Sequence, residues 1–293
     1  MPAVRQTGMD RRYFLRSATT AVTGLALFGG VGSLLTGCGD APADSTPIDV
    51  PVGADDVVVR VEWSGGFTTA EWAFRQLPRL VIGGDRRIYS GAPIAEIYPG
   101  PLVYPVNERS LTKAGLQQIM QLAASLGLLA APPDYELPPG IGIADAADTV
   151  VTLVANGETF VHRAYALDIG DTRTPARDRL RQFVDTIGNL EALVGTAALG
   201  IEQPSMPTQF RIRAAEAGTT DPSGVEPSIV EWPSNTGIVL RDVGNCRLIE
   251  AEPVRELFGA ANEITRFDDG TTLWTLSVTP VLPGDTWQCE AGA

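Results

Sequence analysis

The stretch TVVTLVANGETFVHRAY, residues 149–165, carries two runs of β-branched and aromatic residues on either side of Asn156-Gly157. Asn-Gly between apolar runs is the strongest short-range signal for a β-hairpin, because both residues accept positive φ at low cost. Thr174 and Pro175 follow, in the order expected for an N-cap and a first helical residue. Apolar residues then recur at helical spacing as far as Leu190. The segment therefore predicts an antiparallel hairpin followed by an amphipathic helix.

The same arrangement is expected upstream. Residues 57–63 predict a strand, and residues 80–82 and 87–89 predict a hairpin around Gly83-Gly84-Asp85. A proline-rich loop with one short strand follows, and then a helix with Ser110 as its N-cap, ending at Gly127. Hairpin followed by helix thus occurs twice, at roughly 79–129 and 149–195, as a weak structural repeat.

The C-terminal part is expected to be rich in strands. Residues 196–208 are interpreted as a linker, and strands are predicted at 209–215, at 229–232 and near 237–241. A short helix follows Pro253, and a third hairpin turns at Asp268-Asp269-Gly270. The predicted fold class is α+β, with antiparallel β-hairpins each followed by a helix and a β-rich C-terminal unit. The predicted units are an α+β domain at 55–195 and the β-rich unit, with its one short helix, at 209–293.

The N-terminus is interpreted as a targeting signal. Arg11 and Arg12, followed by Phe14 and Leu15, resemble a twin-arginine export signal, and Leu35-Thr36-Gly37-Cys38 resembles a bacterial lipobox. The resemblance implies that residues 1–37 are a cleaved signal peptide, that Cys38 is acylated and that residues 38–54 form a flexible tether. The competing interpretation is that residues 18–35 are retained as a membrane anchor.

This targeting signal implies a lipoprotein held by a lipid anchor on the outer face of the cytoplasmic membrane. The body resembles uncharacterised actinobacterial envelope lipoproteins, a likeness that rests on the signal and on an arginine bias. Lys113 is the only lysine. The likeness implies no catalytic residues.

Charge excludes one class of partner. The chain has 293 residues and a net charge of −13. Residues 1–37 hold four arginines and one aspartate, so the body that remains after cleavage carries −16. Such an acidic chain is not a nucleic-acid binder that works through a broad basic surface. With 44% hydrophobic and 19% charged residues, it is also not a disordered chain.

Two cysteines remain once Cys38 is acylated. In an oxidising compartment, we expect Cys246 and Cys289 to form a disulfide. The alternative is a pair of buried free thiols. The loop that the bond closes is about 43 residues long, which corresponds to on the order of 4 kcal/mol in the chain-entropy treatment.

Signs of catalysis are few. His162 is the only histidine, and it is interpreted as a surface residue of the hairpin strand that shares a face with Phe160. There is no nucleophile elbow, P-loop or dinucleotide fingerprint, so no cofactor is predicted. The acidic loop at 168–171 lacks calcium-loop spacing, and no metal site is predicted. Glu62 with Glu71, and Asp268 with Asp269, are the carboxylate pairs that glycoside chemistry would require.

The remaining candidate is an aromatic segment. Trp63, Phe67 and Trp72, with Tyr89 further along, form a candidate binding surface for an envelope protein or a glycan. The competing interpretation, which we favour, is that Trp63 and Trp72 join Phe74 in the core.

The missing catalytic residues and the tether favour a non-enzymatic binding or scaffold module at the cell envelope. The alternative is a carboxylate-based hydrolase acting on cell-wall polymer. A weaker third hypothesis is an accessory subunit of another envelope protein.

Overall fold

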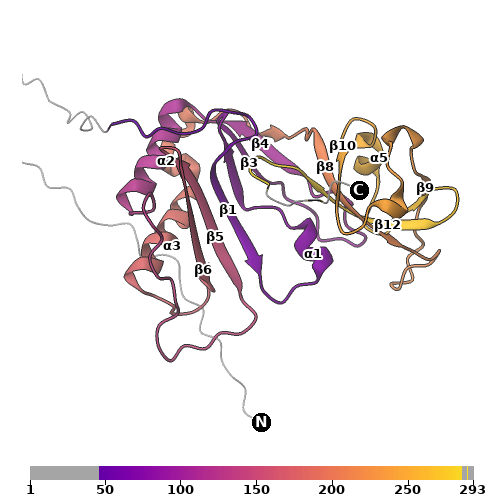
Figure 1. Ribbon diagram of the computed structural model, residues 1–293, viewed down its shortest axis with the longest axis horizontal. Helices are drawn as coiled ribbons and strands as arrows, with labels where there is room; N and C mark the ends of the chain where they lie inside the picture. Colours follow the sequence, from indigo (N-terminus) through magenta and orange to yellow (C-terminus); the bar gives the residue numbers. More distant parts are fainter. Residues whose placement is uncertain (1–45, 286–288, 290–293) are drawn as a thin grey trace, which may run out of the picture. The chain divides into compact units, whose positions relative to one another are not determined.

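The computed structural model describes residues 46–285 and residue 289, which belong to one compact unit of the chain (Figure 1). The residues of the expected export signal and lipidation site, namely Arg11, Arg12, Phe14, Leu15 and Cys38, lie outside the described residues. In the part of the chain that is described, no helix combines the length and the hydropathy needed to cross a membrane.

A seven-stranded antiparallel sheet forms the larger part of the body, with the strand order β6-β5-β1-β2-β3-β4-β7. Its strands are β1 Val57–Gly65, β2 Leu80–Gly83, β3 Arg87–Gly91, β4 Val106–Ser110, β5 Ala147–Ala155, β6 Glu158–Tyr165 and β7 Gln203–Pro204. The short strand β7 lies in the segment that was interpreted as a linker and pairs with β4.

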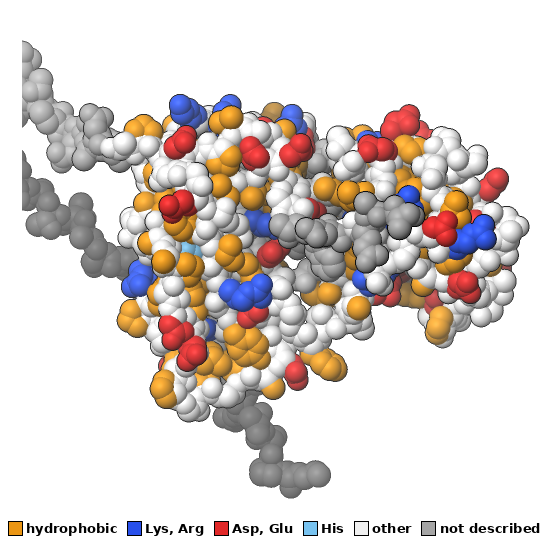
Figure 2. All heavy atoms as spheres, in the orientation of Figure 1, with side chains coloured by type: hydrophobic (Ala, Val, Ile, Leu, Met, Phe, Trp, Pro, Cys, Tyr) orange, Lys and Arg blue, Asp and Glu red, His pale blue; other side chains and the backbone are white. Residues whose placement is uncertain are grey.

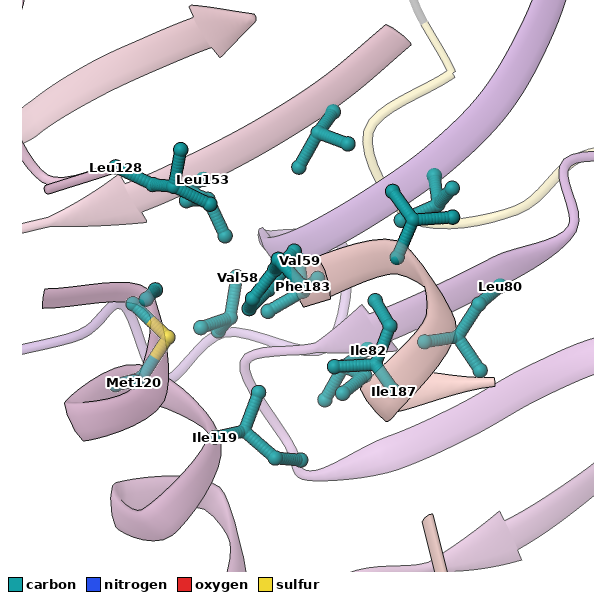
Figure 3. Packing of buried hydrophobic residues seen from close by; sticks show 14 of the residues in the cluster. Val58, Val59, Leu80, Ile82, Ile119, Met120, Leu128, Leu153, Phe183 and Ile187 are labelled. Carbon is teal, nitrogen blue, oxygen red and sulfur yellow. The ribbon is translucent and has the colours of Figure 1, made fainter. Parts of the chain in front are cut away.

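Helices cover one face of this sheet. Figure 1 shows α2 and α3 on the same side of strands β1, β5 and β6. The helical segments of this part are α1 Ala70–Arg75, α2 Lys113–Ser125, α3 Pro175–Ile187, α4 Leu190–Val194 and the 3-10 turn η1 Thr196–Ala198. Buried apolar residues of α2 and α3 interlock with those of the sheet in the main core (Figure 3).

A five-stranded sheet with the order β10-β8-β12-β11-β9 follows, and it has its own apolar cluster. Its elements are β8 Gln209–Glu216, β9 Ile229–Glu231, η2 Ser234–Thr236, η3 Leu240–Asp242, β10 Arg247–Glu250, α5 Arg255–Ala260, β11 Arg266–Asp268 and β12 Leu273–Pro280. Only β9 and β11 pair in parallel among these described strands. Two antiparallel-rich sheets with several helices confirm the α+β class and the β-rich C-terminal part.

Local turn and cap chemistry explains the confirmed elements. Asn156 and Gly157 take φ values of 54° and 76°, and Ala155 pairs with Glu158 across the two-residue turn. Both positive φ values match a type I′ turn, whose twist suits a hairpin. Thr174 accepts a hydrogen bond from the main-chain N–H of Arg177, which is the predicted cap of α3.

Two local predictions were wrong. Thr112, not Ser110, caps α2, and it accepts from the N–H of Gly115 at 3.1 Å. Ser110 is unavailable as a cap because it is the last residue of β4 and pairs with Arg87. The strand expected near 237–241 is instead the 3-10 turn η3, which follows Gly237 in the left-handed region at φ 66°.

Cys246 and Cys289 lie at disulfide distance, as predicted, with their Cα atoms 4.7 Å apart. Cys246 immediately precedes β10, and Cys289 lies in the tail after β12. The pair therefore fastens the C-terminal tail to the second sheet.

Candidate functional site

The aromatic segment lies where β1 leaves the sheet. Gly65 and Gly66 both adopt positive φ, at 76° and 82°, which turns the chain sharply after the strand. Phe67 then donates its N–H to the carbonyl of Asp145 at 3.2 Å. Thr69 caps the short helix α1 by accepting from the N–H of Trp72 at 3.1 Å. The turn is therefore held at both ends by hydrogen bonds.

The expectation that Trp63 and Trp72 fill the core was wrong. Trp63 is 41% exposed, Trp72 46% and Phe67 89%, whereas Phe74 is fully buried. Trp63 follows Val61 on the same face of β1 but lies beyond the last core residue of that strand. Helix α1 has only six residues, and the side of the helix that carries Phe74 is buried. The guanidinium groups of Arg211 and Arg213 lie over the Phe74 ring, 5.0 and 4.8 Å from its centroid.

Tyr89 does not join the other three aromatics. It lies on β3 and packs in a small cluster with Val81, Val106 and Leu282, whereas its neighbour Ile88 belongs to the core beneath the helices. Burial, with Asp85 and Glu108 nearby, raises the pKa of Tyr89 to about 12. The tyrosine is therefore a half-buried phenol on the opposite face of the sheet from Ile88.

Two further loops reach the same end of the sheet as Phe67. The loop after α2 brings Asp145 to Phe67, and the main-chain N–H of Ala166, after β6, bonds Ala147 at the start of β5. These loops expose Ile141 and Ile169. Hydrophobic side chains gather along the lower edge of the body, where β1 ends (Figures 1 and 2). We call the set Trp63, Phe67, Trp72, Ile141 and Ile169 the apolar end.

A cavity of about 150 Å³ lies on the helix-covered face of the sheet. Its apolar lining comes from core residues of β1, β2, β3, α3 and α4, namely Val61, Leu80, Ile88, Val184, Ile187 and Leu190. Arg79, Ser90, Arg109, Gly188 and Glu202 complete the lining. The Arg79 guanidinium also lies over the Trp63 ring, 5.9 Å from its centroid, within cation–π range.

The candidate carboxylates for glycoside chemistry are engaged in structural contacts. Glu62 forms an ion pair with Arg60 at 2.8 Å, and Glu71 accepts from Ser277 at 3.4 Å. Asp268 and Asp269 both bond main-chain N–H groups of the β11–β12 turn. The hydrogen bond from the Thr271 hydroxyl, with those from the N–H groups of Thr271 and Thr272, holds the pKa of Asp269 well below its usual range.

A groove of about 470 Å³ contains carboxylates that are bound to protein groups. Glu108 pairs with Arg87 and accepts from Gln203 and Ser205. Asp285 pairs with Arg60 at 2.7 Å and lies 3.7 Å from Arg211, so the C-terminal tail is tied to both sheets. These ion pairs give Glu108 and Asp285 a packing role.

His162 is buried, which corrects its interpretation as a surface residue. Its Nδ1 accepts from the Tyr135 hydroxyl at 2.7 Å, and its Nε2 donates to the Leu128 carbonyl at 2.8 Å, as a neutral ring would. Burial lowers the pKa of His162. The loop that follows α2 supplies both partners, so the residue fastens that loop to β6. Among the described residues, no group of three or more His, Cys, Asp or Glu side chains is arranged to hold a metal ion.

Comparison with protein-family models, with curated proteins and with solved structures finds no match for this chain. We therefore infer function from the geometry of the chain's own residues. Sequence reasoning missed Arg79, Arg109 and Gly188, because each is an isolated residue of an ordinary type and only the fold brings them to one cavity.

Proposed function

We propose that this chain is a lipid-anchored extracytoplasmic binding module without catalytic activity, which contacts a protein of the cell envelope through its apolar end. The observation that carries the proposal is the exposure of Trp63, Phe67 and Trp72 within ten residues of chain. Solvated clusters of large aromatic residues are uncommon in monomeric proteins and are enriched at the centres of protein interfaces.

The position of this surface suits an anchored protein. The described chain begins at Thr46, and Asp49 bonds Asn156 at the turn of the β5–β6 hairpin, the end of the sheet where β1 starts. The apolar end lies at the other end of β1. The strand has nine residues, which corresponds to about 30 Å between its two ends. The start of the described chain and the apolar end therefore lie at opposite ends of β1.

A protein partner fits the surface better than a glycan does. Sugar-binding sites combine flat aromatic rings with polar groups that bond hydroxyls, whereas this surface adds the aliphatic side chains of Ile141 and Ile169. The carboxylate-based hydrolase has weaker support, because the carboxylates proposed for it lie in ion pairs and turns.

Two experiments test the two parts of the proposal. Mass spectrometry of the membrane-bound protein should find an acylated Cys38 at its N-terminus, and Cys38→Ala should release the protein from the membrane. An intact residue 1–37 segment on the membrane-bound protein would favour the retained anchor.

For binding, the triple variant Trp63→Ser, Phe67→Ser, Trp72→Ser should lose a partner that co-purifies with the wild-type protein from solubilised membranes. The matched control is Ile201→Ser with Leu248→Ser, two exposed apolar residues outside the apolar end. Equal loss in both variants would contradict the assignment. Retention on purified cell wall would indicate a glycan ligand, and release of soluble wall fragments would indicate the hydrolase.

A further inference from the structure

The cavity beneath Arg79 and Arg109 combines an apolar floor with cationic groups at its rim. All six apolar lining residues are at most 8% exposed. Leu80 of β2 and Ile187 of α3, two of these residues, lie near each other in Figure 3. The floor is therefore a continuation of the main core and offers no hydrogen-bonding side chain to a ligand.

The rim offers two guanidinium groups, and one of them has no carboxylate partner among the described residues. None of the described carboxylates forms an ion pair with Arg79, which is only partly exposed. Arg109 forms one ion pair, with Glu191 at 3.3 Å, and because the Glu191 side chain is 60% exposed the pair is partly screened by solvent. Glu202, the one acidic lining residue, accepts from the Asn107 amide at 2.7 Å. The charged side chains of the lining, two arginines and one glutamate, therefore sum to +1, and Glu191 lies outside the lining.

Gly188 keeps space open for the Arg79 guanidinium. Its φ of −62° is an ordinary helical value, so the backbone at this position does not require glycine. A Cβ at Gly188, however, would lie 2.7 Å from Nη2 of Arg79. Any larger residue would displace the guanidinium from its place beside the cavity.

We infer that this cavity binds a small organic anion, with its carboxylate or phosphate at Arg79 and Arg109 and an apolar group in the floor. A cavity of about 150 Å³ lined by Leu, Ile and Phe holds one benzene molecule, and the volume here is about the same. The ligand class is therefore a monoanion whose apolar part is the size of a phenyl ring or a short branched chain. The cavity adjoins the apolar end, because Arg79 also lies over Trp63, but the inference does not depend on the protein-binding role proposed for that end.

The alternative is that Arg79 serves only the fold. The guanidinium lies near the C-terminus of α3, where a cation is favoured by the helix dipole, and it stacks on Trp63. A purely structural arginine and a ligand-binding arginine are distinguished by ligand affinity and not by stability.

The test is isothermal titration calorimetry with benzoate, phenyl phosphate and the neutral isostere benzamide, on the full chain carrying Cys38→Ala. We expect benzoate or phenyl phosphate to bind with a dissociation constant of about 1 mM or lower, as ligands of this size do in a matching site. Benzamide should bind at least about tenfold more weakly, because it lacks the charge that strengthens hydrogen bonds to arginine.

Three variants localise the binding. Arg79→Gln should raise the dissociation constants of both anions about tenfold or more, and Gly188→Ala should also raise them. Ser90→Phe should abolish binding of all three compounds, because the larger side chain fills the cavity. The control Arg173→Gln, at the opposite end of α3, should change nothing. Thermal unfolding of each variant establishes that it is folded.

No binding to the folded wild-type chain at 20 mM of either anion, about twentyfold above the expected constant, would overturn the inference. So would equal affinity for benzoate and benzamide, or an Arg79→Gln variant that binds both anions as the wild type does.

Discussion

Replacing Arg177 by methionine should destabilise the protein strongly, because this guanidinium is a buried junction for main-chain carbonyls. Arg177 is fully buried in α3 and donates to the carbonyls of Thr172, Tyr135, Tyr165 and Ala166 at 2.6 to 3.0 Å. It also donates to the Thr172 hydroxyl at 2.9 Å. The cation thus joins the loop after α2, the end of β6 and the approach to α3.

The cost follows from the acceptors that the substitution leaves behind. Methionine fills a similar volume but donates nothing, so at least two buried carbonyls lose their donor at about 1–3 kcal/mol each. Relief from burying a cation, whose burial also lowers the pKa of Arg177, offsets part of that cost. We expect a net loss of about 3 kcal/mol in the free energy of unfolding.

Urea unfolding of the full chain with Cys38→Ala, followed by far-ultraviolet circular dichroism, measures this loss. Arg177→Lys keeps the charge but has only three donors on a flexible stem, so it should not restore wild-type stability. Arg179→Gln, an exposed neighbour on the same helix, is the matched control and should stay within about 0.5 kcal/mol of wild type. A loss below about 1 kcal/mol for Arg177→Met would refute the reasoning.

Three other predictions use the same unfolding assay. Tyr135→Phe should cost about 1 kcal/mol, because it removes the hydroxyl that bonds His162, and an unchanged midpoint would argue against that bond. Because burial lowers the pKa of His162, its neutral form is favoured in the fold, and stability should fall as pH drops below about 6.5. His162→Gln should reduce the loss of stability at low pH. The same pH profile of stability in the variant and the wild type would count against a contribution from His162. Cys246→Ser with Cys289→Ser should cost about 2–4 kcal/mol for a loop of 43 residues, and no loss would mean that the pair is not bonded in solution.

The elements that the sequence predicts well are those fixed by neighbouring residues. Asn156-Gly157 and Thr174-Pro175 specify a turn and a helix start by their own backbone preferences, and both are confirmed. Ser110 is by its residue type an equally good N-cap. It does not cap the helix because it pairs with Arg87 of β3 as the last residue of β4. Local preference therefore fails where a strand partner distant in sequence decides the outcome.

Burial could not be predicted in the same way. Whether Trp63 is covered depends on where the helices end over β1, and whether His162 is covered depends on the path of the loop after α2. The cavity is harder still to predict, since Arg79 precedes β2, Arg109 lies in β4 and Gly188 follows α3. Chemistry assembled from distant segments leaves no spacing pattern in the chain.

The most direct test of the proposed function is site-specific photo-cross-linking in living cells, with the reactive amino acid in place of Phe67 and, as a control, of Ile201. Both side chains are about nine-tenths exposed, at 89% and 92%, so reactivity is matched. We predict one discrete cross-linked protein at Phe67 that is absent at Ile201 and is lost with Trp63→Ser and Trp72→Ser. No product at Phe67, or the same products at both positions, would contradict a binding role for the apolar end.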